Sequence, residues 1–164
     1  MKMLFPGSFD PFTKGYESIA NQALDLCDEL IIGIAKNSDK KNPFCTDDTK
    51  ATMIAHIFRN NPKVTIKVID GLTSKYCAEN DIKYIVRGVR SARDFETERG
   101  IAQLNEHISG IKTLLLFGDP SLVEISSTMV RELIKYGEDV SEYIPSDIGY
   151  NKEEKRWMLK NKAD

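Results

Sequence analysis

The sequence predicts an α/β fold: a Rossmann-like, doubly wound, mostly parallel sheet with helices on both faces. Apolar strand-like runs alternate with helical stripes along the chain, and polar loops containing glycine or proline separate them. The 164 residues show no repeat or linker and have the length of one domain. We therefore predict a single domain over residues 1–164, ending in a charged helical tail.

The first strand–helix–strand unit occupies the first 36 residues. MKMLF at 1–5 predicts a short buried strand, and ELIIGIAK at 29–36 predicts a second one. Residues 16–27 between them place apolar side chains on one helical stripe. The stripe consists of Ile19, Ala20, Ala23, Leu26 and Cys27.

The same alternation continues towards the C-terminus. Residues 46–60 predict a helix capped by Thr46, and KVTIKVID at 63–70 predicts an alternating strand. A short helix at 74–79 precedes a strand within 83–90, and a further helix ends before a buried strand at 112–117. The charged tail at 153–162, which contains Trp157, predicts the last helix.

Charge and composition exclude several classes of partner. Lys and Arg number 23 against 25 Asp and Glu, so bulk charge points neither to nucleic acid nor to an anionic membrane. No apolar run could span a bilayer and no signal peptide is recognisable, which predicts a cytoplasmic protein. Cys27, Cys45 and Cys77 lack paired spacing, which argues against disulfides and zinc.

The segment GSFDPFTKGY at 7–16 leaves the first strand and enters the first helix. Gly7 allows close approach of the backbone to a ligand, Ser8 supplies a hydroxyl, and Gly15 lies where helix amides face an anion. The segment matches neither the Walker loop nor the three-glycine fingerprint. An ordinary turn with a helix cap therefore explains it as well as phosphate binding does.

The segment YIVRGVRSARDFETE at 84–98 carries three arginines after a buried strand. Arg87 and Arg90 stand on either side of Gly88, where guanidinium groups could clamp a polyphosphate. For Arg93, one helical turn further on, solvated charge balanced by nearby acids is the better interpretation.

Two other loops carry groups suited to anions. Ser126, Ser127 and Thr128 open a helix ahead of Arg131. Three such residues are more than capping requires and favour an anion site, with a capping box as the alternative. Lys40 and Lys41, in NSDKKNPF at 37–44, could fold over a phosphate or simply be solvated.

Taken together, these segments resemble the phosphopantetheine adenylyltransferases, a branch of the nucleotidyltransferase superfamily. The resemblance covers nearly the whole chain through PGSFDPFTKGY, VRGVRSARDFETE, ISSTMVRE and GEDVSEYIP. It implies a Rossmann-like enzyme that transfers the adenylyl group of ATP to 4'-phosphopantetheine, giving dephospho-coenzyme A and pyrophosphate. It also implies a Mg²⁺ ion and a homohexamer.

The resemblance assigns roles by position. Catalysis falls to Tyr16, Lys40 and Arg90. Binding of 4'-phosphopantetheine falls to Ser8, Lys40, Leu72, Thr73, Arg87 and Asn105. Binding of ATP falls to Ser8, Phe9, Tyr16, Gly88, Val89, Arg90, Glu98, Leu122, Val123, Glu124, Ile125, Ser126, Ser127 and Thr128. No residue is assigned as a metal ligand.

One departure from the family pattern concerns a position to which the resemblance assigns catalysis. Family members generally carry histidine where this chain has Tyr16, and His56 and His107 fall on other predicted helices. A phenol donates one hydrogen bond and carries no positive charge near neutral pH. Either the enzyme is active through its remaining groups at a reduced rate, or the chain binds its ligands without transfer, with tyrosine natural or introduced.

A different acceptor is the competing interpretation. Glycerol-phosphate cytidylyltransferases and nicotinamide-mononucleotide adenylyltransferases share the first loop and the ISSTMVR style of segment. The arginine segment and the position of Lys40 favour 4'-phosphopantetheine.

Overall fold

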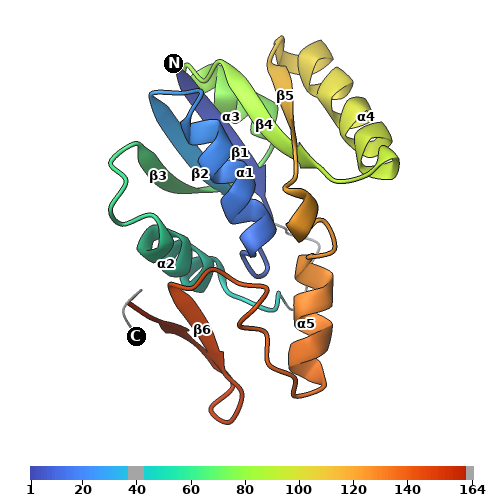
Figure 1. Cartoon of the computed structure of the whole chain (residues 1–164). Helices are drawn as coiled ribbons and strands as arrows, with labels where there is room; N and C mark the ends of the chain where they lie inside the picture. The colour runs from blue at the N-terminus through green and yellow to red at the C-terminus, as the bar shows by residue number, and fades with distance from the viewer. Residues whose placement is uncertain (37–42, 162–164) are drawn as a thin grey trace.

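The central sheet of the protein is parallel and doubly wound. The computed structural model describes residues 1–36 and 43–161, and its main sheet has five parallel strands in the order β3-β2-β1-β4-β5 (Figure 1). The strands are β1 (Lys2–Gly7), β2 (Glu29–Ala35), β3 (Val64–Ile69), β4 (Tyr84–Val89) and β5 (Lys112–Phe117). This order confirms the predicted fold class, and it puts the reversal of strand order between β1 and β4.

Helices cover both faces of this sheet. They are α1 (Lys14–Leu24), α2 (Asp47–Ile57), α3 (Thr73–Glu79), α4 (Ala92–Ser109) and α5 (Ser127–Lys135), with a 3₁₀ turn at Pro120–Leu122. In the described part of the chain, no helix is both long enough and apolar enough to cross a bilayer.

Side chains that alternate between the two faces of β1 contribute to an apolar core on each side of the sheet. Met3 and Phe5 belong to an apolar cluster that includes α1 and α2, whereas Leu4 belongs to a second cluster with Cys77 of α3. Side chains two residues apart share one face of a strand, so a short apolar run supplies both cores.

Local capping fixes where the helices begin. Thr13, Thr46, Ser91 and Ser126 each accept a hydrogen bond from the amide three residues ahead. The predicted cap at Thr46 is therefore confirmed.

Two sequence predictions about apolar faces need correction. Helix α1 ends at Leu24, so neither Leu26 nor Cys27 belongs to its apolar stripe. Leu26 is 48% exposed, and Cys27 is buried in the segment that follows the helix. Strand β5 is not buried along its length, because it forms an edge of the sheet and its last residue, Phe117, is 83% exposed.

The C-terminal tail is a β-hairpin, so the predicted helix over 153–162 is wrong for the described residues. Strands β6 (Ile148–Asn151) and β7 (Arg156–Leu159) pair antiparallel, with Tyr150 opposite Trp157. The Asn151 side chain accepts hydrogen bonds from the amides of Glu153 and Glu154 and shapes the turn. Cross-strand aromatic packing thus outweighs the helix-favouring composition of the turn.

Candidate active site

A cavity of about 250 Å³ opens at the carboxyl ends of β1 and β4, where the strand order reverses. Residues that follow β1, β4 and β5 line it, together with the first turn of α1 and the loop before α5. Ligands of open α/β sheets bind at such a switch point, because neighbouring loops diverge there to opposite faces. The winding of the chain therefore brings together the three loop segments that the sequence singled out.

The first loop is held in a strained and well-anchored conformation. Phe9 has φ +47° and is fully buried, an uncommon backbone conformation for a bulky residue. A Cβ atom on Gly7 would lie 2.7 Å from the ring of Phe9, so glycine is required there. The buried Asp10 carboxylate accepts hydrogen bonds from the amides of Phe44 (3.0 Å) and Cys45 (2.6 Å). These contacts fix the loop that carries Ser8 to the cavity wall.

Arg87 is clamped by a carboxylate from α4. Its Nε and Nη2 atoms donate to the two carboxylate oxygens of Glu98, both at 2.8 Å, and Nη1 donates to the Pro6 carbonyl at 2.6 Å. A guanidinium has five N–H donors, so these bonds leave two for a ligand. The fork fixes the plane of the guanidinium at the cavity edge.

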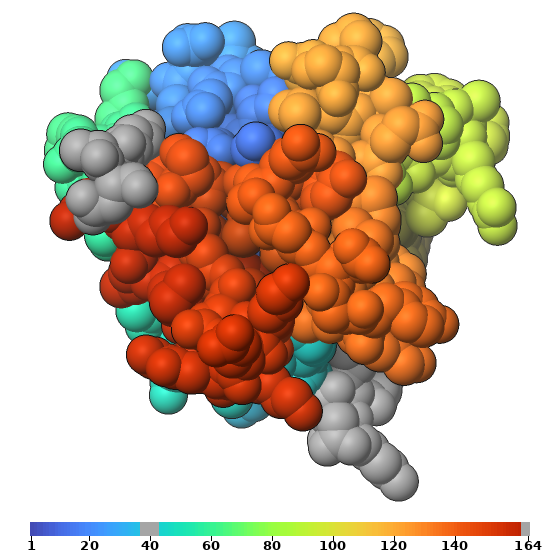
Figure 2. All heavy atoms as spheres, turned by 60° about the horizontal axis from the view of Figure 1, so that its bottom comes forward, coloured from blue at the N-terminus to red at the C-terminus, as the bar shows by residue number. Residues whose placement is uncertain are grey.

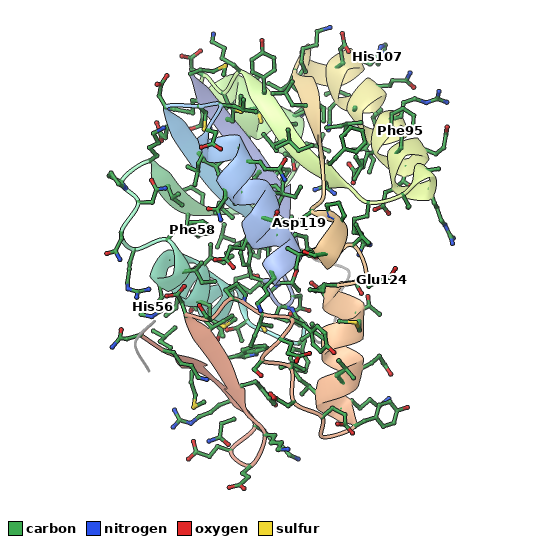
Figure 3. The ribbon with its side chains drawn as sticks, viewed as in Figure 1. His56, Phe58, Phe95, His107, Asp119 and Glu124 are labelled. Carbon is green, nitrogen blue, oxygen red and sulfur yellow. The ribbon has the colours of Figure 1, made fainter. Side chains whose placement is uncertain are left out.

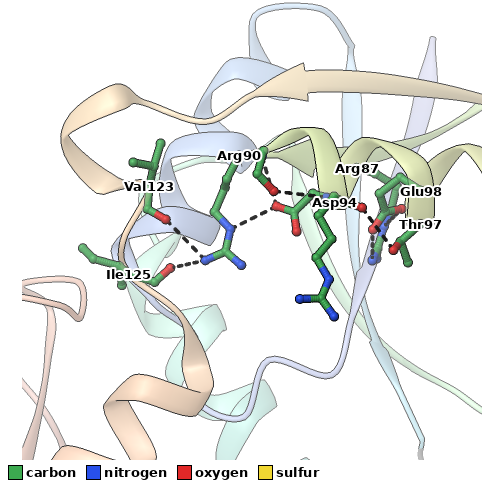
Figure 4. A network of polar contacts seen from close by, with 9 residues as sticks. Arg87, Arg90, Asp94, Thr97, Glu98, Val123 and Ile125 are labelled. Carbon is green, nitrogen blue, oxygen red and sulfur yellow. Dashed lines mark hydrogen bonds and ion pairs between the residues drawn. The ribbon is translucent and has the colours of Figure 1, made fainter.

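Arg90 ties together two loops that border the cavity (Figure 4). Its Nε donates to Asp94 Oδ2 at 3.2 Å, and its Nη1 donates to the Ile125 carbonyl at 2.9 Å. Its backbone amide also donates to Asp94, at 3.1 Å. Nη2 keeps both of its donors, so Arg90 can position the 123–125 segment and still contact an anion.

A close contact between helix and sheet gives the cavity its floor. A Cβ atom on Gly88 would lie 2.8 Å from Cγ1 of Ile19, so α1 packs directly on β4 at this point. The N-cap residues Thr13 of α1 and Ser126 of α5 both line the cavity. Two helix N-termini thus face it, and their amides and dipoles favour negative charge.

Tyr16 lies in the cavity wall within an aromatic cluster. Its ring centroid is 5.1 Å from that of Phe9 and 5.7 Å from that of Phe12. Its hydroxyl lies 3.5 Å from Ser127 Oγ, which in turn donates to the Pro11 carbonyl at 2.7 Å. The phenol is therefore positioned by packing on one side and by a hydroxyl on the other.

Most of the predicted site residues converge on this one cavity. The cavity wall includes Ser8, Tyr16, Arg87, Gly88, Val89, Arg90, Glu98, Leu122, Val123, Ile125 and Ser126. Phe9 lies beneath the wall in the core, which restricts it to backbone contacts with a ligand. Lys40, together with Lys41, lies outside the described residues.

Other predicted residues lie away from the cavity wall. Leu72 and Thr73 are at the start of α3, Asn105 is in α4, and Leu72 is 52% exposed. Ser127 is buried behind Tyr16, while Thr128 accepts a hydrogen bond from Arg131. Glu124 is exposed beside the 3₁₀ turn (Figure 3).

The cavity also contains residues that the sequence did not single out. Asp94, first interpreted as charge balance, holds Arg90, and an i, i+4 spacing between the two was the signal that could have identified it. Asp119 follows β5 in the cavity wall, and hydrogen bonds from Ser121 lower the pKa of its carboxyl group. Ile19 is a core residue whose proximity to Gly88 becomes visible only in the folded chain.

Neither histidine is near the cavity. His56 lies on α2, where Nε2 contacts the Lys160 carbonyl at 2.6 Å, and His107 lies in the last turn of α4 (Figure 3). This agrees with the sequence analysis, which placed both residues on other helices. Neither imidazole of this chain therefore lines the cavity.

Comparisons with known proteins give the family. A cytidylyltransferase-like family model matches residues 4–133. A phosphopantetheine adenylyltransferase of Bacteroides thetaiotaomicron is 41% identical, over 92% of this chain and 99% of its own length. Another, from Phocaeicola vulgatus, is 43% identical, over 88% of this chain and 95% of its own length. The chain belongs to the phosphopantetheine adenylyltransferase family.

Solved structures add support for the fold alone. A bifunctional NMN adenylyltransferase/ADP ribose pyrophosphatase from Francisella tularensis superposes with a TM-score of 0.67 at 15% identity. The superposition covers 87% of this chain and 44% of that protein. Phosphopantetheine adenylyltransferases are nucleotidyltransferases, and their membership of this fold agrees with the sheet order and with the position of the cavity.

Proposed function

We propose that the protein transfers the adenylyl group of ATP to 4'-phosphopantetheine in coenzyme A biosynthesis, giving dephospho-coenzyme A and pyrophosphate. Family membership supports this reaction. The observation that carries the proposal within the chain is the convergence of Ser8, Arg87 and Arg90 with two helix N-termini on one cavity at the switch point.

The reaction mainly requires that two anions, ATP and 4'-phosphopantetheine, are aligned. The acceptor phosphate is already a nucleophile, so attack on the α-phosphorus of ATP needs no covalent enzyme intermediate. In the proposed arrangement, Ser8 and Arg87 hold the acceptor phosphate, and Arg90 with the Ser126 end of α5 holds the phosphates of ATP. Donors fixed beforehand stabilise charge that develops during transfer without having to reorient.

Charge within the described cavity is nearly balanced before substrates bind. Arg87 is paired with Glu98 and Arg90 with Asp94. The remaining guanidinium donors and the helix N-termini would therefore contact the phosphates, and Lys40 would add positive charge. In this scheme Asp94 and Glu98 position the arginines, and Glu98 also lines the cavity in which ATP would bind.

A Mg²⁺ ion is proposed to accompany ATP. In the described residues, no group of three or more His, Cys, Asp or Glu side chains could hold a metal by itself. Mg²⁺ commonly uses one or two carboxylates together with phosphates and water, so the residues present fit an ion that arrives on the nucleotide. Asp119 is the candidate carboxylate, because it lines the cavity and, within residues 1–36 and 43–161, makes no ion pair with an arginine. The bound ion would neutralise charge on the phosphates.

The arm of 4'-phosphopantetheine is proposed to leave the cavity towards α3 and α4. Leu72 and Thr73 begin α3, Asn105 lies on α4, and these two helices contact each other. Exposed Leu72 offers apolar surface to the methyl-bearing part of such an arm. Asn105 offers both a donor and an acceptor for its amides.

We further propose that the protein acts in the cytoplasm as a homohexamer. Helix α4 supports self-association, because Glu98 is its only buried residue and four large apolar residues on it are exposed. These are Phe95, Ile101, Leu104 and Ile108. Ile101, Leu104 and Ile108 are spaced by three and four residues and so share one side of the helix, and clustered exposed apolar side chains of this kind mark interfaces.

Replacement of Tyr16 tests the catalytic scheme. Tyr16→His should raise turnover strongly, by roughly the 2–4 kcal/mol that one transition-state donor is worth, with little change in ATP affinity. Tyr16→Phe, which keeps the ring contacts with Phe9 and Phe12 but lacks the hydroxyl, is the matched control and should lose turnover. Unchanged turnover in Tyr16→His would refute the proposed role of this position.

Assays of transfer separate the remaining alternatives. Release of pyrophosphate at high enzyme concentration, with dephospho-coenzyme A detected directly, excludes a protein that only binds its ligands. A panel of phosphate acceptors offered with ATP and with CTP tests the substrate. Preference for CTP or for nicotinamide mononucleotide would remove the 4'-phosphopantetheine assignment.

A further inference from the structure

A second hollow lies between α5 and the C-terminal hairpin. Its volume is about 520 Å³, and it shares no lining residue with the cavity at the switch point. The two elements occupy the same face of the molecule, α5 in orange and the hairpin in red (Figure 2). The volume falls within the range of roughly 300–1,000 Å³ that small-molecule sites occupy.

Four cations line this hollow. Arg131 and Lys135 come from α5, and Lys152 and Lys155 come from the hairpin turn. Glu132 is the single acidic residue among those that line it. The lining thus carries a clear excess of positive charge in a chain whose formal net charge is -2.

These cations make no ion pair within the described part of the chain. Arg131 donates from Nη1 to the Asp10 carbonyl at 2.7 Å and from Nη2 to Thr128 Oγ1 at 3.2 Å, both neutral acceptors. Lys152 Nζ approaches the Gly137 carbonyl at 3.4 Å, again a neutral group. Lys152 also lies near Asp139 and helps to lower the pKa of that carboxyl group, after the hydrogen bonds from Ser141. Like charges drawn together repel one another, and an anion between them relieves that repulsion.

Aromatic packing holds the hairpin wall of the hollow in place. Tyr150, on the hairpin, lies 5.0 Å from Trp157 and 6.3 Å from Phe44, measured between ring centroids. Phe44 and Tyr150 both line the hollow. The hairpin lysines are therefore mounted on a packed element rather than on a free tail, which favours a defined site over a diffuse charged surface.

We propose that this hollow binds a compact, multiply charged oxyanion of the pyrophosphate or phosphate-ester class. Lysine and arginine donors from two elements converge on one concave space, as recognition of phosphate oxygens requires. The site is independent of the transfer reaction proposed for the first cavity, because its lining comes from α5, Phe44 and the hairpin.

The chain carries a natural reporter for this site. Trp157 is its single tryptophan, and it packs against both aromatic residues that line the hollow. Titration of the full chain with sodium pyrophosphate at constant ionic strength should give a saturable change in tryptophan fluorescence. Isothermal titration calorimetry provides an independent dissociation constant.

The decisive comparison uses two double variants. Lys152→Gln/Lys155→Gln removes two of the cations at exposed positions and should weaken pyrophosphate binding about tenfold or more in the fluorescence titration. Lys67→Gln/Lys83→Gln changes charge equally at exposed positions that line neither hollow and should behave as wild type. Arg131 is left unchanged, because it also holds the first loop through the Asp10 carbonyl.

A third variant separates the two cavities. Arg90→Ala removes a lining residue of the switch-point cavity and should leave the tryptophan response to pyrophosphate intact. The absence of a saturable response in the wild-type chain would overturn the proposal. So would equal affinity in Lys152→Gln/Lys155→Gln and in the control, or loss of the response in Arg90→Ala alone.

Discussion

At the scale of single residues, the arginines of the candidate active site are fixed before any ligand binds. Arg87 makes a two-pronged contact with Glu98, and Arg90 contacts Asp94 and the Ile125 carbonyl. A guanidinium that is already oriented loses little conformational freedom when it binds phosphate. The acids in this segment therefore act as supports for the arginines rather than as solvated counter-charges.

The Arg87–Glu98 pair should contribute measurably to stability. The side chains are 30% and 11% exposed, so Glu98→Gln leaves a largely enclosed guanidinium without its counter-ion. We expect a loss of about 1–3 kcal/mol in the free energy of unfolding, measured by equilibrium urea denaturation. Glu96→Gln, which breaks the exposed pair with Arg99 on the same helix, should cost less than about 0.5 kcal/mol. Equal losses in the two variants would contradict this assignment.

The cysteines should be unreactive in the folded protein. Burial, and then the nearby Asp10 carboxylate, raises the pKa of Cys45 to about 12, and burial raises the pKa of Cys77 to about 11. Burial also raises the pKa of Cys27. Because a raised pKa keeps a thiol protonated until the pH approaches that value, few thiolates exist at pH 8.

A thiol-disulfide exchange reagent at pH 8 provides the measurement. It should modify the native chain slowly and the urea-unfolded chain rapidly, at all 3 cysteines. Rapid stoichiometric modification of the native protein would show that at least one thiol is accessible.

At the scale of elements, the C-terminal hairpin braces the segment that holds the first loop. Trp157 of β7 packs on Phe44 with a centroid distance of 6.3 Å, and the amide of Phe44 donates to the Asp10 carboxylate. The hairpin thus lies two contacts away from the loop that presents Ser8. A helix of the same residues would not pair Tyr150 with Trp157 across two strands.

Truncation of the hairpin tryptophan tests this brace. Trp157→Ala should lower the free energy of unfolding by about 1–3 kcal/mol, since it removes a half-buried aromatic contact. Leu159→Ala, at a position 49% exposed in the same strand, should have a much smaller effect in the same urea titration. If the two truncations cost the same, packing by Trp157 does not anchor the hairpin.

At the scale of the whole molecule, the sheet order decides where chemistry can occur. The β3-β2-β1-β4-β5 order separates the loops of β1 and β4 and leaves a cavity between them. The same order places β5 and α4 at one side of the molecule, where apolar side chains remain exposed (Figure 1). A family enzyme that assembles with itself would bury that side.

Charge placed on α4 tests the proposed assembly. Leu104 is 57% exposed, so Leu104→Glu should leave the fold intact and shift the chain to smaller species in sedimentation velocity. Gln103→Glu adds the same charge next to it, at an exposed polar position. A wild-type monomer, or an equal shift in both variants, would exclude α4 as the self-association surface.

Much of this architecture can be predicted from the sequence, because short-range sequence patterns determine where most strands and helices form. Short apolar runs predict β1, β2 and β4, alternation predicts β3, and Thr46 marks a helix start through a bond to a residue three positions away. The C-terminal hairpin shows where prediction from local sequence patterns fails. Its charges favour a helix locally, but the partners of Trp157 lie on another strand and at Phe44, far away in sequence. Periodicity cannot reveal such long-range packing.

The amino-acid sequence by itself determined the parallel α/β class, the three loops with groups suited to anions and the family to which they belong. Tertiary structure alone decided that Arg87 pairs with Glu98, that Arg90 joins two loops, and that Tyr16 lies between an aromatic cluster and Ser127. The physical reason is that strand pairing and side-chain packing act between residues far apart in the chain. The composition of the loops indicates which residues can donate hydrogen bonds to an anion, but only the order of the strands sets the distances between these residues.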